Sequence, residues 1–424
     1  MTIKICLVGP GHVASNPRLV KEADALQQAG YDVRVVAPID MSDQVSKLDF
    51  SILQNTKWKL QGFSKGGKIY YKCLGVIAKM CLWLTSVGIR IQLVDTLALY
   101  RLHFRVLKEL LKEPADIYLT HHLFVLPAAL QAARKYNAIL GYDAEDYLPG
   151  ELPDRIEYQG LSSLYDRLLG YYIRTCNYVS AASPLISQQL FKRYGVKSTV
   201  ILNVFPLGHR QYEPNQKQNV HNPSMYWFSQ TVGEGRGIEK MIVIMQYMKT
   251  PAHLYLRGHV DDEYKIGLIE LAGNQLSSRI HFLASAEPNF MIGLAKPYTL
   301  GLSIDENQPL NRDICITNKI FTYLLAGIPV MLSSTRANKE LAPRLKDAAL
   351  LFDMEQPQAT AQALDEFFTD ASRIGSAKKT SLELALKRYN WEHEKHIMLI
   401  NIKNVLEKNI VFEENNQKIS YKSL

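Results

Sequence analysis

The sequence predicts an α/β protein built from two consecutive doubly wound domains that face a cleft. A chain of 424 residues is too long for one ordinary core, since domains usually hold roughly 100 to 200 residues. In both halves short apolar runs alternate with amphipathic helical stretches, a rhythm typical of parallel sheets. A polar stretch at residues 208–224 interrupts the rhythm, as a linker would. Ligands bind at the carboxyl ends of strands in such sheets, so we expect the active site in the cleft.

The N-terminal half begins with a βαβ unit. We expect a strand at residues 3–8, a tight turn at 9–11, a helix at 17–29 that ends at Gly30, and a second strand at 31–36. Further strands are expected at 117–119, 139–142, 178–181 and 199–202, with a helix at 127–136. These elements assign residues 1–207 to the first domain.

The same rhythm restarts after the linker. Strands are expected at 225–228, 253–256 (ending at Gly258), 280–283, 300–303 and 330–332, and a glycine-rich loop at 233–237 precedes a helix. These elements assign residues 225–390 to the second domain. A helix is expected at 391–410, followed by a polar tail at 411–424.

Composition and cysteine usage indicate a globular, cytoplasmic protein. The chain is 47% hydrophobic and 21% charged. Its five cysteines are scattered and form no CxxC pair, which predicts neither a disulfide framework nor a zinc site. A strand-like run follows Met1 almost at once, so no secretory signal is expected. We expect the protein to work in the cytosol or on the inner face of a membrane, without a nucleic-acid partner.

Positive charge gathers in one part of the first domain. Residues 47–112 hold twelve Lys or Arg against three acidic residues, and within them residues 73–89 are apolar apart from Lys79, Thr85 and Ser86. This run is shorter than the roughly 20 residues that span a bilayer. Two interpretations follow: an interfacial helix that contacts an anionic membrane through residues 65–105, or a pair of helices that pack into the first domain.

The turn at residues 9–14 fits a GxGxxA pattern, in which backbone N–H groups can approach a phosphate. Gly11 is therefore a candidate phosphate contact, or else part of a turn that only joins strand to helix. A nicotinamide-dependent oxidoreductase would also need an acidic residue at the tip of the second strand. That tip reads Val36-Ala37-Pro38, and Asp40 lies beyond the proline. The oxidoreductase interpretation is therefore the least favoured.

Several short motifs follow one another along most of the chain. They are Asn16-Pro17-Arg18 with Glu22 and the helix and strand at 25–36, Thr120-His121-His122, residues 142–146, Asn203, residues 235–239 and, most specific, residues 317–330. Together they resemble the family 4 glycosyltransferases, which have the GT-B fold of two Rossmann-like domains. The resemblance implies a retaining transfer from a nucleoside-diphosphate sugar held by the second domain to an acceptor presented by the first. It also implies that residues 391–410 pack back on the first domain.

The donor site implied by the resemblance needs positive charge near a diphosphate. A helix that starts at Asn318 offers N–H donors and a favourable dipole, and Lys319 adds a point charge. Arg236 stands where the family has a lysine. Thr231 replaces the usual arginine, so Arg312 or Lys319 would supply a second cation. The candidate donor-binding residues are Gly11, Arg236, Gly258, Arg312, Asn318, Lys319 and Thr322.

Thr322 stands where the family usually has a glutamate that binds the nucleotide ribose. It is either a weaker ribose contact through one hydroxyl or an ordinary helix residue. No tightly bound cofactor or metal is implied. In keeping with this, Asp261 and Asp262 are adjacent and do not form the spaced Asp-x-Asp pair of a metal-dependent donor site.

The candidate catalytic residues are His121, Asp143 and Glu145. His121 matches a family histidine that ends a strand, and Glu145 stands where the family often has a histidine. Each could orient or deprotonate an acceptor hydroxyl within hydrogen-bond reach, or serve only as a structural partner.

The acceptor expected from the basic, apolar segment is a glycan or a lipid-linked precursor, in surface polysaccharide or glycolipid biosynthesis. Two other functions stay open. The replaced glutamate and arginine would suit a catalytically degenerate GT-B protein that binds or scaffolds, and a GT-B epimerase would convert a nucleotide sugar without an acceptor.

Overall fold

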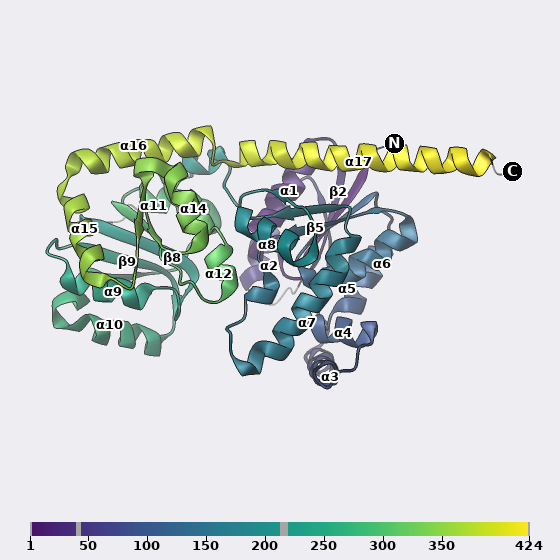
Figure 1. Cartoon of the computed structure of the whole chain (residues 1–424), viewed down its shortest axis with the longest axis horizontal. Helices are drawn as coiled ribbons and strands as arrows, with labels where there is room; N and C mark the ends of the chain where they lie inside the picture. Colours follow the sequence, from purple (N-terminus) through teal and green to yellow (C-terminus); the bar gives the residue numbers. More distant parts are fainter. Residues whose placement is uncertain (1, 40–43, 213–218, 423–424) are drawn as a thin grey trace. The chain divides into compact units, whose positions relative to one another are not determined.

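The computed structural model describes residues 2–39, 44–212 and 219–422. The chain forms two compact units. Unit 1 comprises Met1–Ile201 together with Lys395–Leu424, and unit 2 comprises Leu202–Glu394. Figure 1 shows a sheet covered by helices in each unit. No helix among the described residues is long and apolar enough to cross a bilayer.

Unit 1 is built on a parallel sheet with seven strands among the described residues, in the order β3-β2-β1-β4-β5-β6-β7. The strands are β1 (Lys4–Val8), β2 (Asp32–Pro38), β3 (Lys59–Phe63), β4 (Ile117–His121), β5 (Ile139–Ala144), β6 (Tyr178–Ala181) and β7 (Thr199–Val200). The chain first builds outward from β1 to β3 and then crosses to β4 on the other side of β1. The neighbours β1 and β4 therefore form the topological switch point of this sheet.

Eight α-helices of unit 1 connect these strands in the described ranges, and a ninth joins the units. They are α1 (Pro17–Gln28), α2 (Gln44–Leu53), α3 (Lys68–Ser86), α4 (Gln92–Leu99), α5 (His103–Leu110), α6 (Leu126–Tyr136), α7 (Ile156–Tyr172), α8 (Pro184–Tyr194) and α17 (Trp391–Lys422). α17 also includes residues 411–422, the described part of the expected polar tail, so the helix is longer than the expected 391–410; residues 423–424 lie outside the described residues. Sequence analysis also missed β3, a polar edge strand, and the strand Ala349–Phe352 of unit 2.

Unit 2 repeats the architecture with six parallel strands among its described residues, in the order β10-β9-β8-β11-β12-β13. The strands are β8 (Ser224–Val232), β9 (His253–Val260), β10 (Ile280–Leu283), β11 (Leu300–Ser303), β12 (Val330–Ser333) and β13 (Ala349–Phe352). Here the switch point lies between β8 and β11. Residues 213–218 of the expected linker lie outside the described part of the chain.

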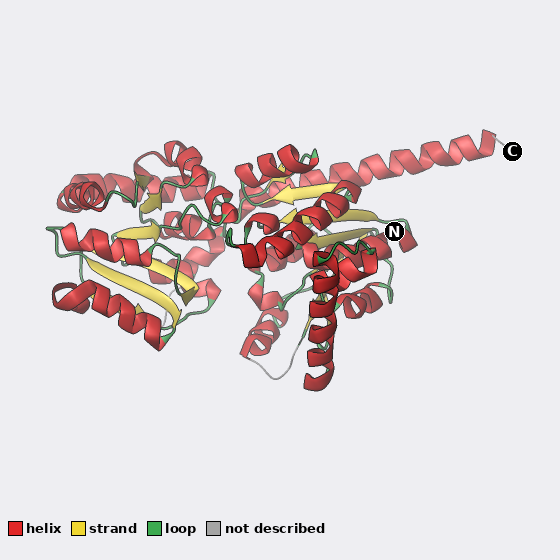
Figure 2. Ribbon diagram, turned by 60° about the horizontal axis from the view of Figure 1, so that its bottom comes forward, coloured by secondary structure: helices red, strands yellow, loops and turns green. Residues whose placement is uncertain are grey.

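Helices cover both faces of the second sheet. Figure 1 shows α9 and α10 on one side and α14 and α16 on the other. The helices are α9 (Ile238–Tyr247), α10 (Asp262–Leu276), α11 (Met291–Ala295), α12 (Leu310–Ile314), α13 (Asn318–Ala326), α14 (Arg336–Leu345), α15 (Pro357–Thr369) and α16 (Ala371–Lys387). Figure 2, coloured by secondary structure, shows the same layers from a second direction. Apolar side chains of β8, β9 and β11 pack with those of α9, α10 and α15 into one core.

Two glycines fix how the β8 loop approaches its neighbours. A Cβ atom on Gly237, which has φ +76°, would lie 2.0 Å from the carbonyl oxygen of Ile304. A Cβ atom on Gly258, at φ +149°, would lie 2.5 Å from the carbonyl oxygen of Ser229. Only glycine adopts both backbones without strain. The loop at 233–237 therefore reaches the end of β11 because Gly237 lacks a side chain.

Replacing Gly237 with alanine tests this packing. We expect Gly237→Ala to lower the free energy of unfolding of unit 2 by about 3 kcal/mol or more, because the backbone and the Ile304 carbonyl must both move. Gly267→Ala is the matched control, since its Cβ meets nothing within 4 Å in α10, and it should raise stability by about 0.5–1 kcal/mol. Chemical denaturation measures both. Equal effects of the two changes would contradict the close approach.

Candidate functional site

A pocket lies at the switch point of unit 1. It has a volume of about 190 Å³ and is lined by the turn after β1, by the ends of β4 and β5 and by the residues that follow them: Gly9, Pro10, Gly11, His12, Ser15, Asn16, His121, His122, Tyr142, Asp143, Glu145, Asp146 and Leu148. All three candidate catalytic residues are among them. The pocket thus forms where the chain reverses its direction of winding, the usual position of a ligand site in such sheets.

A buried ion pair lies beside this pocket. Arg18 Nε donates to Asp143 Oδ2 at 2.6 Å and Nη2 donates to Oδ1 at 2.8 Å, while the Ser180 hydroxyl donates to Oδ1 at 2.5 Å. Arg18 Nη1 donates to the carbonyl oxygen of Ile201 at 2.7 Å. Burial would raise the pKa of Asp143, but Arg18 holds it below its usual range. Asp143 is fully buried and bound to these partners, so it positions other groups.

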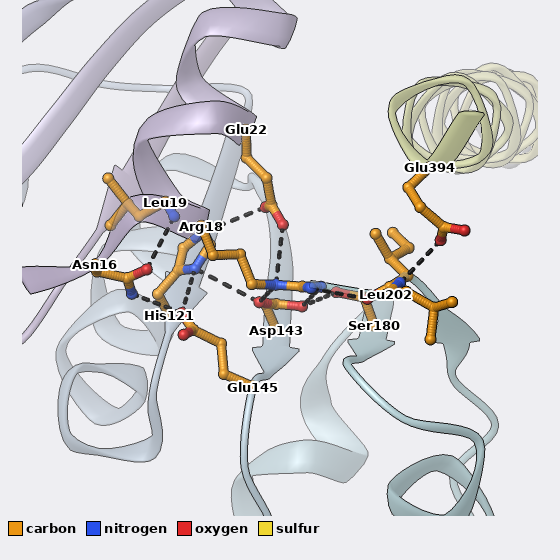
Figure 3. Close-up of polar contacts among 11 residues, drawn as sticks. Asn16, Arg18, Leu19, Glu22, His121, Asp143, Glu145, Ser180, Leu202 and Glu394 are labelled. Carbon is orange, nitrogen blue, oxygen red and sulfur yellow. Dashed lines mark hydrogen bonds and ion pairs between the residues drawn. The ribbon is translucent and has the colours of Figure 1, made fainter. Parts of the chain in front are cut away.

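The start of α1 explains why Arg18 enters this position (Figure 3). Asn16 caps the helix by accepting a hydrogen bond from Leu19 N at 3.0 Å. Pro17 occupies the first helical position, where its missing N–H costs nothing. The following Arg18 then points at the carboxyl ends of the strands, and the amide of Asn16 donates to Glu145 Oε1 at 2.6 Å. The Asn-Pro-Arg motif therefore starts the helix and places the Arg18 guanidinium at the strand ends.

The parallel register of the sheet places His121 beside Asp143. His121 pairs with Asp143, and Asp143 pairs with Ser180, across β4, β5 and β6. His121 Nε2 lies 3.2 Å from Glu22 Oε2 in α1, and its Nδ1 lies 3.0 Å from Glu145 Oε1. Burial would lower the pKa of His121, but the carboxylates of Glu22 and Glu145 outweigh it and raise the pKa to about 10. This raised pKa favours the imidazolium form of His121 at neutral pH, and an imidazolium is a poor general base.

Glu145 is the candidate carboxylate that faces the pocket with some exposure. Its side chain is 28% exposed, whereas that of Asp143 is fully buried. Burial would raise the pKa of Glu145, but hydrogen bonding to His121 lowers it. A carboxylate held in this way can accept hydrogen bonds from hydroxyl groups in the pocket.

His122 carries backbone strain next to the pocket. It has φ 108°, a region that non-glycine residues rarely adopt. Its Nδ1 accepts a hydrogen bond from Phe124 N at 3.3 Å, and burial lowers its pKa to about 4. The pKa values of His121 and His122, adjacent in sequence, are therefore shifted in opposite directions, which favours a charged His121 and a neutral His122.

His12 is a pocket residue that sequence analysis did not single out. Its Nδ1 lies 2.7 Å from Asp49 Oδ2, and Asp49 Oδ1 accepts from Ala14 N at 2.8 Å. Its Nε2 lies 3.4 Å from Lys65 Nζ. A carboxylate on one ring nitrogen fixes the orientation of the imidazole. The contact to Asp49, more than thirty residues away, distinguishes this histidine, and sequence spacing does not show it.

Among the described residues, Glu22, His121 and Asp143 bring their ligand atoms within 4.8 Å of one another, close enough to share a metal ion. However, Arg18 already lies against both carboxylates, at 2.6 Å from Asp143 and 3.4 Å from Glu22. A metal would have to displace this guanidinium and the proton on His121. The donor set therefore fits an ion-pair network better than a metal centre.

Cations gather at the switch point of unit 2. Arg236 lies in the loop after β8, and its Nη1 is 3.9 Å from Oδ1 of Asp305, just beyond the end of β11. Lys319 Nζ, in the first turn of α13, lies 3.7 Å from Asp305 Oδ2. Arg312 donates through Nη1 to the carbonyl oxygen of Gly235. Burial and nearby Arg236 lower the pKa of Arg312. Two of these cations share the Asp305 carboxylate and the third lies against the same loop, so the group is suited to an anion.

The other expected donor-binding residues lie as follows. Asn318 opens α13 and is exposed, and this helix start has no side-chain cap and no acidic residue in its first turn. Thr322 is fully buried and donates to the carbonyl oxygen of Asn318 at 3.3 Å, as an ordinary helix residue does. Gly258 lies inside β9, where close packing accounts for it. Gly11 lines the pocket of unit 1, whereas the other six residues belong to unit 2.

Comparison with known proteins supports the fold. No protein-family model matches the chain, and no curated protein is significantly similar in sequence. HepE of Anabaena in complex with UDP is 15% identical with a TM-score of 0.66, over 95% of this chain and 100% of that one. Sucrose-phosphate synthase from Thermosynechococcus elongatus is 13% identical with a TM-score of 0.68, over 96% and 100%. S. aureus MnaA with UDP is 13% identical with a TM-score of 0.56, over 96% and 97%. The chain therefore has the GT-B fold, which confirms the predicted fold class.

Removing one partner of the buried pair should be costly. We expect Asp143→Asn to lower the free energy of unfolding by about 3–5 kcal/mol, because the Arg18 charge stays buried without its main partner. Glu407→Gln removes a carboxylate from the exposed pair with Lys403 in the same unit and should cost less than about 1 kcal/mol. Denaturant unfolding of both variants measures the difference. A loss below about 1 kcal/mol for Asp143→Asn would show that the buried pair is not important for folding.

The charge of His121 predicts a stability change at alkaline pH. Its folded pKa of about 10 lies above the unfolded value of roughly 6.5, so its contribution is complete below pH 6.5 and is lost as pH rises through about 10. NMR titration of the imidazole resonances measures the pKa directly. Glu22→Gln should lower it, because one carboxylate is removed. Titration of native His121 near pH 6.5 would contradict the imidazolium assignment.

Proposed function

We propose that this protein is a glycosyltransferase that moves a sugar from a nucleoside-diphosphate sugar to a hydroxyl of a glycan or lipid-linked acceptor. The observation that carries the proposal is the cation group at the switch point of unit 2. Arg236, Arg312 and Lys319 gather at the start of α9 and α13, where a departing diphosphate would be stabilised by charge and by helix N-termini. In this proposal residues 225–390 hold the donor and residues 1–207 present the acceptor.

The donor is proposed to be a UDP-sugar. Two structural neighbours, HepE and MnaA, are described in complex with UDP, and another HepE structure contains UDP-glucose. No tightly bound metal or cofactor is proposed, because three protein cations supply the positive charge that a metal would otherwise bring to the diphosphate. Asp305, which now lies between Arg236 and Lys319, would share these cations with the phosphate oxygens.

The acceptor hydroxyl is proposed to lie in the pocket of unit 1. Glu145 would accept a hydrogen bond from it and orient it. His121 is protonated and Asp143 is bound by Arg18, so neither would take the hydroxyl proton. In a retaining transfer the bond from the anomeric carbon to the diphosphate breaks, the acceptor oxygen bonds to the same face of that carbon, and its proton goes to the leaving phosphate oxygen. We propose this retaining course, in surface polysaccharide or glycolipid biosynthesis on the cytoplasmic side.

Binding of the donor is the first test. A nucleotide at a hundredfold excess over its Kd stabilises the native state by about 2.7 kcal/mol, which thermal unfolding detects. We expect UDP to raise the Tm and Arg236→Ala to raise the Kd about tenfold or more, since a charge-assisted contact is lost. Arg373→Ala, an exposed arginine of the same unit, should bind as the native protein does, and EDTA should change nothing. Loss of binding in both variants, or in neither, would refute this donor site.

The anomeric configuration of the product tests the course of the reaction. With a UDP-sugar and an accepted hydroxyl compound, NMR of the product should show the configuration of the donor. An inverted product would point to His12, whose ring is oriented by Asp49 at 2.7 Å, as a general base on the acceptor side, and His12→Gln would then abolish transfer. Donor conversion without any acceptor would indicate an epimerase, and binding without turnover a degenerate GT-B protein.

A further inference from the structure

The helix α3 carries a continuous stripe of exposed apolar side chains. The stripe, called here the α3 stripe, consists of Ile69, Cys73, Val76, Met80 and Trp83 in α3 and of Val87 at its C-cap. Its members follow one another at alternating intervals of four and three residues, so with about 3.6 residues per turn they share one face. Five of them are between 55% and 81% exposed, and Cys73 is exposed as well. An apolar face of this extent is unusual on a protein surface without a partner.

The opposite face of α3 packs against the rest of unit 1. Cys81 and Thr85 are buried, and the guanidinium of Arg101 lies 3.9 Å from the ring centroid of Tyr71. Arg90 donates through Nη1 to the carbonyl oxygen of Thr85 at 2.8 Å. The buried side chains and the Arg101 contact fix the rotation of the helix about its axis, while the Arg90 bond closes its C-terminal end. Figure 2, in which the bottom of Figure 1 comes forward, shows α3 along its length at the edge of unit 1. The α3 stripe is therefore held outward by the packing behind it.

Positive charge borders the α3 stripe on one side. Lys68, Lys72 and Lys79 are exposed, and each precedes a stripe residue by one position, which places all three along the same flank of the helix. Residues 65–94 contain five Lys or Arg and no Asp or Glu. If two copies of the chain associated through the α3 stripe, their lysines would come together, and residues 65–94 offer no carboxylate to form ion pairs with them. An anionic lipid surface offers both an apolar layer and negative charge.

We propose that the α3 stripe and its flanking lysines dock unit 1 on a bilayer surface that contains anionic lipid. α3 would lie in the plane of the interface, with the stripe among the acyl chains nearest the headgroups and the lysines against lipid phosphates. Trp83, near the end of the stripe, would sit at the depth that indole rings favour. This inference rests on α3 alone and is independent of the proposed glycosyl transfer, since vesicle binding and UDP binding are measured separately.

Tryptophan fluorescence gives a readout specific to α3. Of the four tryptophans, Trp58, Trp227 and Trp391 are buried, whereas Trp83 is 61% exposed. We expect vesicles of phosphatidylcholine with phosphatidylglycerol to shift the emission of the full chain to shorter wavelength, as Trp83 leaves water. In Trp83→Phe the shift should disappear while cosedimentation with the same vesicles persists. An unchanged shift in Trp83→Phe would place the lipid contact elsewhere and overturn the proposal.

Surface variants test the apolar and the charged parts separately. Val76→Ser with Met80→Ser should abolish cosedimentation. Changing Lys68, Lys72 and Lys79 to glutamine should weaken it by about fivefold per lysine, since each contributes roughly 1 kcal/mol at an anionic surface. Matched controls are Phe191→Ser in α8 and Ile266→Ser in α10, which are exposed to a similar degree and should bind as the native chain does. All variants should keep the native Tm, because the changed side chains are exposed.

Three results would overturn the proposal. The first is no binding to the anionic vesicles at low ionic strength. The second is equal binding to vesicles of phosphatidylcholine alone, which would leave the lysines without a role. The third is a dimer in light scattering that the Val76→Ser, Met80→Ser variant dissolves, because the α3 stripe would then be an interface between two copies of the chain.

Discussion

The buried ion pair between Arg18 and Asp143 determines the arrangement of unit 1. Moving two charges out of water costs several kcal/mol per ion, so the pair persists only because paired hydrogen bonds and Ser180 satisfy both partners. The pair holds the first turn of α1 against the ends of β5 and β6. Glu22 and Glu145 lie against the two ring nitrogens of His121 and raise its pKa. The same contact holds Glu145 in a fixed orientation at the pocket.

The two units have the same kind of sheet topology, but different charged groups lie at their switch points. Each sheet reverses its winding once, between β1 and β4 in unit 1 and between β8 and β11 in unit 2. At the first switch point carboxylates and histidines line a pocket, which suits hydroxyl groups. At the second, Arg236 and Lys319 flank Asp305 and Arg312 binds the carbonyl of Gly235, which suits an anion. A reaction between a hydroxyl compound and a diphosphate sugar needs these two environments, and the fold supplies one in each unit.

The sequence predicted the fold and many of the residues at both switch points, because apolar periodicity and glycine positions report local backbone structure. It placed His121, Asp143 and Glu145 at strand ends, where they are found. It did not predict their charge states, which depend on Arg18 and Glu22 more than ninety residues away. It missed His12 because Asp49 reaches it only in the folded chain.

Thr322 was ambiguous in sequence, and its burial favours the role of a helix residue. For residues 73–89 sequence analysis left two interpretations open; α3 packs one face against unit 1 and exposes the other, and contact with a membrane stays a proposal.

The central claim is that the cations at the second switch point form the nucleotide-sugar site. The most direct measurement is a crystal structure of the protein with UDP. The account predicts the β-phosphate within hydrogen-bond distance of Arg236 and of the first N–H groups of α13, with Lys319 turned from Asp305 toward the phosphate. UDP bound instead in the pocket of unit 1, or away from both switch points, would contradict the assignment of donor and acceptor sites.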